Sequence, residues 1–261
     1  MNNTLVKGIA VLELLAHSSR PLRLTHIAAE LGIAKSNVHR LMQALVEMRY
    51  VLRDEESSTY SASIKLWELG TAVLGKLDLR RHAEQQMNAL QDETGETVHL
   101  SVLDRNQVVY VHKVESMNPV RAYTQIGGRV PAYCVATGKA QLAYRSESML
   151  AEMSGRLEGH TPNTIVDPAR FLREMKKARA QGFAVNRGEW RDNVWGIAAP
   201  IMGAKGAAIA AVGISGPADR IRKKHLQDSA ALVAAAAAAI SEALGSVAQL
   251  DALLNLGRRA A

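Results

Sequence analysis

Apolar positions in the first fifty residues recur at the spacing of amphipathic helices. A helix is expected over 5–16, with an apolar face formed by Leu5, Ile9, Leu12 and Ala16. The stretch SSRPL at 18–22 interrupts this pattern. A second helix is expected over 26–31, with Thr25 as its N-cap and Gly32 at its end.

A third helix is expected within 34–50, and it has two distinct faces. Its apolar stripe consists of Val38, Leu41, Met42 and Leu45. Two short extended runs follow, 50–53 and 59–63, on either side of the polar turn DEESS at 54–58. Three short helices followed by such a hairpin are typical of a winged helix-turn-helix.

The remaining chain predicts an α+β domain. Helical spacing continues from Ile64 to Gly95, with a break expected near Asp78, which indicates a linker helix followed by the first helix of a second domain. Period-two alternation then predicts a hairpin over 98–112 around the turn 104–107, and further strands at 120–126, 183–186, 197–202 and 207–215. Helices are expected at 137–143, 146–153, 171–180 and 225–244. The sheet is expected to be mostly antiparallel and flanked by helices.

Composition narrows the class of protein. A chain of 261 residues with 48% hydrophobic residues suggests two globular domains. A single cysteine, Cys134, excludes an intramolecular disulfide and a cysteine-rich zinc site. No signal peptide is recognised, and the longest apolar run, 230–240, is too short to span a bilayer, so a cytoplasmic protein is expected.

The polar face of the third helix carries the chemistry of DNA recognition. Arginine can pair with guanine, and asparagine or glutamine with adenine, while small polar and basic side chains reach phosphates. The face is short of acids, with Glu47 alone between Ile33 and Met48, whereas an ordinary solvated face mixes both signs. The net charge of +7 adds only weak support, because the excess is spread over both halves. The candidate DNA-binding residues are Thr25, Lys35, Ser36, Asn37, His39, Arg40 and Gln43.

A glycine-rich segment, GGRVPAYCVATGKA at 127–140, precedes the helix expected near Thr137. Backbone N–H groups at a helix N-terminus favour an anion such as a carboxylate, and simple turn geometry is the alternative explanation of the glycines. The segment is not a phosphate-binding P-loop, since Tyr133 and Ala140 occupy positions where that motif needs glycine and a hydroxyl.

The chain resembles the IclR family of bacterial transcription regulators. The similarity lies in ELGIAKSNVHRLMQALVEMRYV (30–51), ETGETVHLSV (93–102), IGGRVPAYCVATGKAQLA (126–143), QGFAVNRGEW (181–190), GIAAPI (196–201) and VGISGPADRI (212–221). The resemblance implies a winged helix-turn-helix over 1–63, a linker helix over 64–81, a GAF-like effector-binding domain over 82–245 and a C-terminal tail over 246–261. It also implies a dimer formed by the N-terminal helices and linker, often paired into a tetramer.

The same resemblance implies an effector pocket lined by Val130, Ala136, Thr137, Asn186, Val194, Gly196, Gly213 and Ser215. Asn186 stands where the family often has an acid, and Gly196 and Gly213 stand where some members have polar residues. These departures favour a roomier pocket or a bulkier effector. Trp190 and Trp195 are expected nearby, either at the ligand or in a core or interface.

Other classes of function have less support. A catalytic Cys134 paired with His99, His112 or His160 is conceivable, but no spacing supports it and no zinc-protease, serine-hydrolase or dinucleotide motif is present. A winged helix that binds protein or RNA is the second alternative, since the acidic turn 54–58 is poorly suited to phosphate. No cofactor, metal or membrane is expected. The favoured hypothesis is a homo-oligomeric regulator that binds a palindromic DNA operator and responds to a small organic acid, controlling a catabolic operon.

Overall fold

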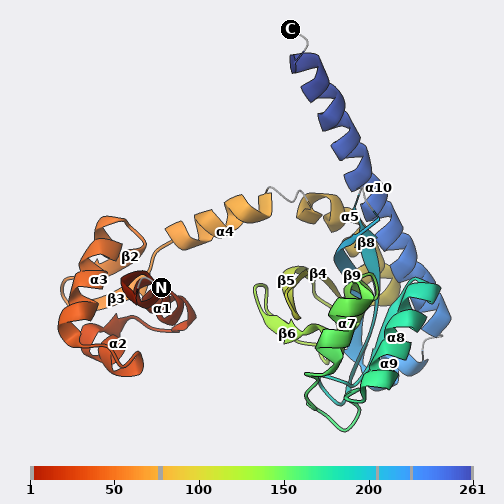
Figure 1. Ribbon diagram of the computed structural model, residues 1–261, viewed down its shortest axis with the longest axis horizontal. Helices are drawn as coiled ribbons and strands as arrows, with labels where there is room; N and C mark the ends of the chain where they lie inside the picture. The colour runs from red at the N-terminus through yellow and green to blue at the C-terminus, as the bar shows by residue number, and fades with distance from the viewer. Residues whose placement is uncertain (1–2, 76–78, 204–205, 224–225, 260–261) are drawn as a thin grey trace. The chain divides into compact units, whose positions relative to one another are not determined.

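The computed structural model describes residues 3–75, 79–203, 206–223 and 226–259, with side chains omitted at 3, 73–75, 223 and 246–259. The chain divides into two compact units, Met1–Lys76 and Leu77–Ala261 (Figure 1). The break expected near Asp78 lies outside the described residues. The first unit ends within the predicted linker, whose bounds remain a prediction.

The first unit is a winged helix-turn-helix. Its elements are α1 (Asn3–His17), β1 (Leu22–Arg23), α2 (Leu24–Glu30), α3 (Lys35–Glu47), β2 (Val51–Asp54), β3 (Thr59–Ala62) and α4 (Lys65–Gly75). The strands pair antiparallel in the order β1-β3-β2. Gly32, between α2 and α3, has a φ of 61°, a left-handed conformation that glycine adopts without steric cost. The three helices and the hairpin were thus predicted correctly from the sequence.

Three details of this unit differ from the expectation. The buried face of α1 carries Val11 and Leu15, whereas Leu5 and Ile9 are 63% and 48% exposed, so the predicted apolar face is not the one that packs into the core of this unit. Helix α2 begins at Leu24 after Arg23, and Thr25 therefore lies inside the helix and is not its N-cap. Strand β1 was missed because two residues are too few to show a period.

The second unit is a six-stranded antiparallel sheet between two helical layers, within the described residues. Its elements are α5 (Leu79–Thr94), β4 (Thr97–Asp104), β5 (Gln107–Val114), β6 (Arg129–Pro131), the short η1 (Ala132–Cys134), α6 (Ala136–Leu142), α7 (Glu147–Ser154), α8 (Pro168–Gln181), β7 (Ala184–Arg187), β8 (Val194–Met202), β9 (Ala208–Pro217), α9 (Ala218–Lys223) and α10 (Leu226–Arg259). The strand order is β6-β5-β4-β9-β8-β7. The expected α+β class is confirmed.

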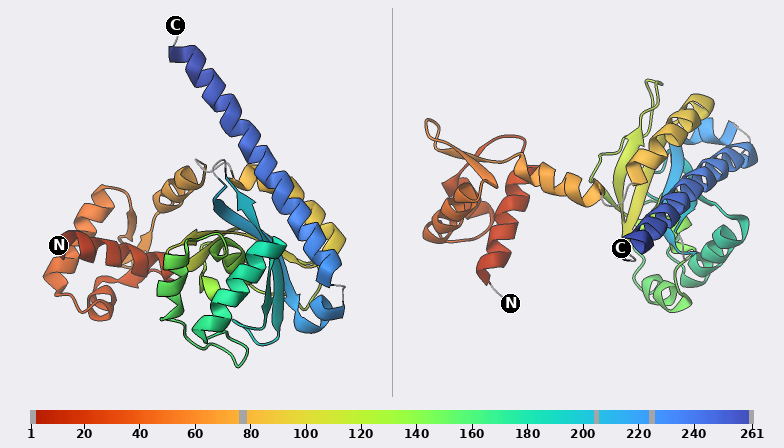
Figure 2. Two further views of the ribbon diagram at one scale, coloured as in Figure 1. Left: turned by 45° about the vertical axis from the view of Figure 1, so that its right-hand side comes forward. Right: turned by 90° about the horizontal axis from the view of Figure 1, so that it is seen from above.

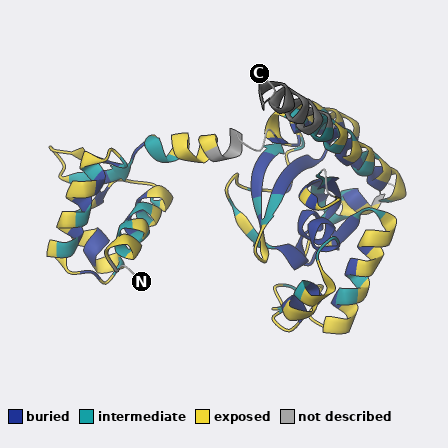
Figure 3. Ribbon diagram, turned by 45° about the horizontal axis from the view of Figure 1, so that its top comes forward, coloured by how far each residue is buried: buried dark blue, intermediate teal, exposed yellow. Residues whose placement is uncertain are grey.

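The helices cover the sheet unequally. Helices α5 and α10 pack against each other on one face, over β4 and β8 (Figure 2). Helix α6 covers the other face, where small residues such as Ala136, Ala140 and Ala198 allow close contact, and α8 packs behind it. Burial is concentrated in the sheet and α6, while the outer surface of α8 is exposed (Figure 3).

Three predictions in this unit were wrong. Residues 120–126 form no strand, and the strand that pairs with β5 is β6. Helix α9 was not expected, and α10 continues to Arg259 past the predicted end at Leu244. The boundary at 245 therefore lies within a continuous helix.

Helix α10 has a 20-residue window, Leu226–Gly245, that is long and apolar enough to cross a membrane by length and composition alone. The expectation that length excludes a span was therefore too strict. A core helix passes the same test, and Val233 and Ile240 of α10 are fully buried. About 33% of the apolar window is buried, so packing against the sheet and α5 accounts for one face of the helix.

Candidate functional site

The polar face of α3 is open to solvent. Lys35, Ser36, His39, Arg40 and Gln43 are exposed and Asn37 is half-buried, while Val38, Met42 and Leu45 enter the core. Thr25 is exposed on α2. Leu41, expected in the buried stripe, is only partly buried. The periodicity of the sequence thus assigned the two faces of this helix correctly.

Arg40 and Asn37 contact each other on that face. Arg40 Nη2 donates to Asn37 Oδ1 at 3.1 Å, one helical turn away. The contact orients a guanidinium and a carboxamide, the two groups suited to reading base edges, side by side. The hairpin that follows is acidic, and the Ser57 hydroxyl, donating to Asp54 at 2.6 Å, holds the pKa of that carboxyl below its usual value. The wing therefore offers little to phosphates.

A cavity of about 550 Å³ lies in the second unit. Seven of the eight predicted effector residues border it, namely Val130, Ala136, Thr137, Asn186, Val194, Gly196 and Ser215. They come from strands at both ends of the sheet and from α6, and they lie up to 85 positions apart in the chain. The fold therefore brings the predicted set together in one place.

Gly213 does not border this cavity. A Cβ at Gly213 would overlap the carbonyl oxygen of Ile197 and the side chain of Ala198 on the neighbouring strand. The argument that its small size leaves room for an effector was therefore wrong, since close strand packing requires glycine there. Gly196 does border the cavity, and a Cβ on it would stand 3.0 Å from the Ile214 carbonyl oxygen.

A histidine at the cavity wall was missed by the sequence reasoning. His99 of β4 is buried, and its Nε2 lies 2.6 Å from Ser215 Oγ while its Nδ1 lies 3.2 Å from Thr124 Oγ1. Burial lowers the pKa of His99 to about 4, so the ring is neutral at pH 7. In the sequence, His99 alternates with Val98 and Leu100, which indicates that it lies on the other face of the strand. This pattern does not indicate that a cavity lies on that face.

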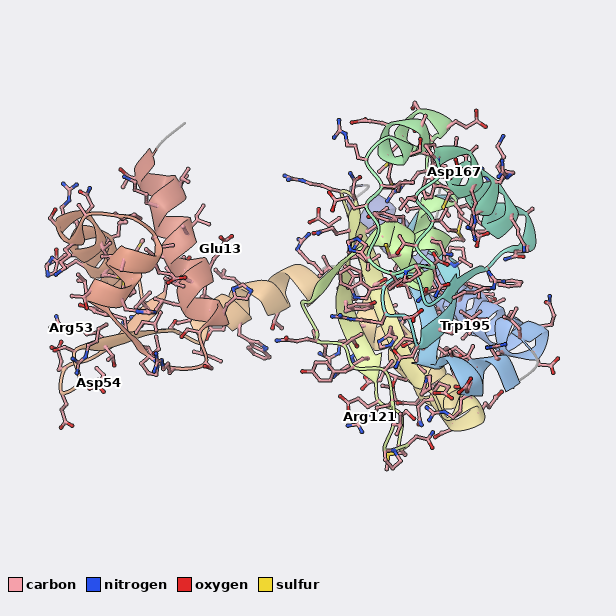
Figure 4. The ribbon with its side chains drawn as sticks, turned by 90° about the horizontal axis from the view of Figure 1, so that it is seen from below. Glu13, Arg53, Asp54, Arg121, Asp167 and Trp195 are labelled. Carbon is pink, nitrogen blue, oxygen red and sulfur yellow. The ribbon has the colours of Figure 1, made fainter. Side chains whose placement is uncertain are left out.

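The segment 121–125 also borders the cavity, although it was predicted to be a strand. Lys113 Nζ donates to the Thr124 carbonyl at 2.9 Å, and Arg121 pairs with Glu115 at 3.2 Å. Figure 4 labels Arg121 on this segment. The loop is therefore held by side-chain contacts in place of a strand ladder.

The polar groups around the cavity include three guanidinium groups. Arg121 and Arg129 form ion pairs with Glu115 and Asp104. Arg191 lies 5.4 Å from the ring of Trp190, which also borders the cavity, and forms no ion pair within the described residues. The wall thus offers one uncompensated positive charge.

Two further hydroxyls complete the wall. The Thr137 Oγ1 atom is buried beside the Tyr110 hydroxyl. Burial raises the pKa of the adjacent Tyr110 to about 12, so the phenol stays protonated at pH 7. Both groups can therefore serve as neutral donors.

The geometry does not favour a cysteine nucleophile. Cys134 is buried, and desolvation raises the pKa of its thiol to about 12. His160 lies 3.1 Å from the Tyr133 hydroxyl, and His99 is engaged by Ser215 and Thr124. Among the described residues, no group of three or more His, Cys, Asp or Glu side chains is placed to hold a metal ion.

A buried ion-pair cluster lies behind the cavity. Lys139 of α6 is fully buried, and its Nζ lies 2.7 Å from Glu189 Oε1 and 3.3 Å from Glu174 Oε1. Burial raises the pKa of Glu189, while the Lys139 charge opposes that rise. Asn186, on the cavity wall, accepts the Glu189 backbone N–H at 2.8 Å, so the cluster supports the wall.

Comparisons with known proteins cover both units. Residues 4–55 match the IclR helix-turn-helix domain, and residues 71–242 match the bacterial transcriptional regulator IclR C-terminal domain. The HTH-type transcriptional regulator KdgR of Escherichia coli is 34% identical over 248 residues, covering 93% of each chain.

Solved structures agree. The IclR crystal structure from Thermotoga maritima is 31% identical, with a TM-score of 0.78 over 94% of this chain and 100% of that one. An IclR homologue from Microbacterium hydrocarbonoxydans, solved with 4-hydroxybenzoate, is 23% identical, with a TM-score of 0.82 over 93% of this chain and 99% of that one. The chain belongs to the IclR family of bacterial helix-turn-helix transcription regulators.

Proposed function

We propose that this regulator binds a palindromic operator in the cytoplasm through α3 and that a small organic acid in the 550 Å³ cavity changes operator binding. The cavity carries the proposal, because it gathers the predicted effector residues beside the unpaired Arg191 and the neutral His99–Ser215 pair. Apolar walls with a few convergent polar groups are the usual make-up of a metabolite site.

The polar groups that line the cavity favour a ligand with a carboxylate over a ligand with an amine. Arg191 offers a positive charge, and the Ser215, Thr137 and Tyr110 hydroxyls offer donors to a carboxylate. Helix α6 has seven residues and begins at Ala136 without a side-chain cap, so its N-terminus is a weak anion site. The Arg191 guanidinium and the three hydroxyls are therefore the main groups that would recognise the carboxylate, in place of the helix N-terminus expected from the sequence. The IclR homologue solved with 4-hydroxybenzoate, itself a carboxylate, is consistent with this class of ligand.

At the DNA end, α3 enters the major groove of each half-site. A two-fold dimer would match a two-fold operator, and pairing of dimers would give a tetramer. Effector binding changes operator affinity to the extent that the ligand prefers one arrangement of the two DNA-binding units. Catabolic genes are the expected targets, since an organic acid is a substrate or product of such pathways.

The effector proposal is tested by calorimetry of the full-length chain against mono- and dicarboxylates and their matched amides. We expect saturable binding of carboxylates and at least about tenfold weaker binding of the amides, since charge-assisted hydrogen bonds are lost. Ser215→Ala should weaken carboxylate binding and leave DNA affinity without ligand unchanged. Binding of amides or amines alone would overturn the carboxylate assignment.

Lys35 should act through phosphates. It is exposed at the first turn of α3, where it reaches the backbone more easily than base edges. We expect Lys35→Ala to reduce the slope of log K against log salt by about one unit, because one fewer counterion is released. Lys177→Ala, an exposed lysine on α8, is the control. A salt slope equal to that of the wild type would contradict a phosphate contact.

A further inference from the structure

A second cavity, of about 470 Å³, lies at the β7 edge of the same sheet. Three arginines border it from three elements, with Arg170 on α8, Arg187 on β7 and Arg222 on α9. Arg187 and Arg222 lie 6.0 and 5.6 Å from the ring of Trp195, which also borders the cavity. Figure 4 labels Trp195. Two guanidinium groups are therefore gathered around one indole.

The three arginines of this cavity have no direct charged partner among the described residues. None of Arg170, Arg187 and Arg222 forms an ion pair or donates a side-chain hydrogen bond within the described residues. Three acids also border the cavity. Glu174 and Glu189 share the buried Lys139, and Asp192 Oδ1 accepts from the neutral Asn163 amide at 2.6 Å and keeps its charge. With Lys139 included, four basic groups stand against these three acids, which leaves a net excess of one positive charge.

We propose that this cavity is a second ligand site, which takes a small metabolite carrying two or more anionic oxygen groups, either a phosphate ester or a polycarboxylate. Guanidinium groups bind both kinds of oxyanion through paired N–H donors, and three of them around one cavity suit a multiply charged ligand better than a monocarboxylate. The indole of Trp195 offers an apolar surface to the carbon skeleton.

The strand register separates this site from the effector cavity while keeping the two in contact. Asn186 pairs with Gly196 and Arg187 with Trp195 across β7 and β8. Because side chains alternate along a strand, the first pair borders the effector cavity and the second borders the new one. The connection 188–193 continues this division, with Trp190 on the first cavity and Glu189 on the second.

A shared wall implies coupling between the sites. An anion that draws Arg187 and Trp195 inward would act on the strand residues directly adjacent to Asn186 and Gly196. The second ligand should then change the affinity of the first, and by thermodynamic linkage the first should change the second equally. This coupling rests on the proposed function of the effector cavity, whereas the anion site itself does not.

The test uses the tryptophan positions. In the full-length Trp67→Phe/Trp190→Phe chain, Trp195 is the remaining tryptophan of the three. Pyrophosphate and citrate are titrated separately, without effector and at constant ionic strength, and Trp195 emission is recorded. We expect a saturable change with at least one probe, and the probe that binds more tightly identifies the phosphate or carboxylate class. Calorimetry of the chain with all three tryptophans should give the same affinity.

Arginine variants assign the signal to the cavity. Arg170→Ala and Arg222→Ala should each weaken binding at least about tenfold, since each removes a charge-assisted contact. Arg173→Ala, an exposed arginine of α8 outside the cavity lining, should change it less than about twofold. Absence of a saturable signal up to about 10 mM, or equal effects of all three variants, would overturn the site.

The same titrations separate the two proposals. Probe binding that is sensitive to Arg170 and Arg222 stands even if no carboxylate binds the Ser215 cavity, in which case only the effector proposal fails. Where a carboxylate does bind that cavity, saturating probe should change its affinity at least about threefold. An unchanged affinity would overturn the coupling.

Discussion

Replacement of Lys139 by methionine should destabilise the second unit, Leu77–Ala261, by about 3–5 kcal/mol, because two carboxylates would lose their common cation in a buried site. Lys139 is fully buried, and the Glu189 side chain is only 4% exposed. Methionine matches the four-atom stem of lysine as far as Cε and lacks the ammonium group, so the loss mainly reports the missing charge. Urea unfolding followed by tryptophan fluorescence measures it, since Trp190 and Trp195 both lie in this domain.

The pH dependence of Lys139→Met gives an independent check. Burial already raises the pKa of Glu189 above its usual value, and removal of the Lys139 charge raises it further. A raised carboxyl pKa means that the folded state binds the proton more tightly than the unfolded state. The loss of unfolding free energy in Lys139→Met should therefore be complete above the pKa that Glu189 has in the folded variant. The loss should shrink as the pH falls through that pKa, because the protonated carboxyl needs no cation.

Two controls isolate the ion pair. Lys177→Met replaces an exposed lysine of α8 and should change stability by less than about 0.5 kcal/mol. The triple variant Lys139→Met/Glu174→Gln/Glu189→Gln removes all three charges and should recover part of the loss, because neutral groups need no buried cation. An unfolding midpoint for Lys139→Met equal to that of the wild type would show that the cluster adds no stability.

The Lys139 cluster also shows where sequence reasoning stops. Lys139 attracted attention only as part of a glycine-rich segment, because its partners Glu174 and Glu189 follow 35 and 50 positions later. Local spacing reports which face of an element is apolar, but it carries no information on pairing over such separations. A lysine in a short helix therefore had no visible reason to be buried.

Elements with a clear apolar period were predictable because the information lies within the segment itself. Helix α3 and the β4–β5 hairpin each bury one face, so the spacing of apolar residues within each segment is enough to predict the element. Segment 120–126 has strand-like composition, yet side-chain contacts from Lys113 and His99 hold it as a loop along the cavity. The effector residues came from the family resemblance, and Gly213 shows its limit, since a matching position can be reserved for strand packing.

Trp190 and Trp195 border different cavities, a division that the sequence left undecided. Trp195 faces the β7 edge with Arg187, whereas Trp190 follows Glu189 in the connection and borders the effector cavity. The spacing of five positions between the two tryptophans does not indicate whether either one contacts a ligand or packs in the core. The register of β7 against β8 determines the side that Trp195 occupies, and the conformation of the connection 188–193 determines the side that Trp190 occupies.

Arg40→Ala should weaken operator binding by about 1–3 kcal/mol while leaving the fold intact. Arg40 is exposed and its side chain donates to its neighbour Asn37 on the same helix face, so circular dichroism and thermal unfolding should not change when Arg40 is replaced. Gel-shift titration on a duplex selected by the wild-type protein from a random library measures the loss. Arg156→Ala, at an exposed ion pair of the effector domain, is the matched control.

Sequence dependence distinguishes a base contact from a phosphate contact at Arg40. If Arg40 reads a base edge, its removal should cost more on the selected duplex than on a scrambled one, and it should relax preference at one position of each half-site. Asn37→Ala, which removes the acceptor that orients the guanidinium, should reproduce part of this loss, and the double variant should lose less than the sum because the residues act together. Equal losses on both duplexes would reassign Arg40 to the phosphates, and unchanged affinity on both would remove it from the interface.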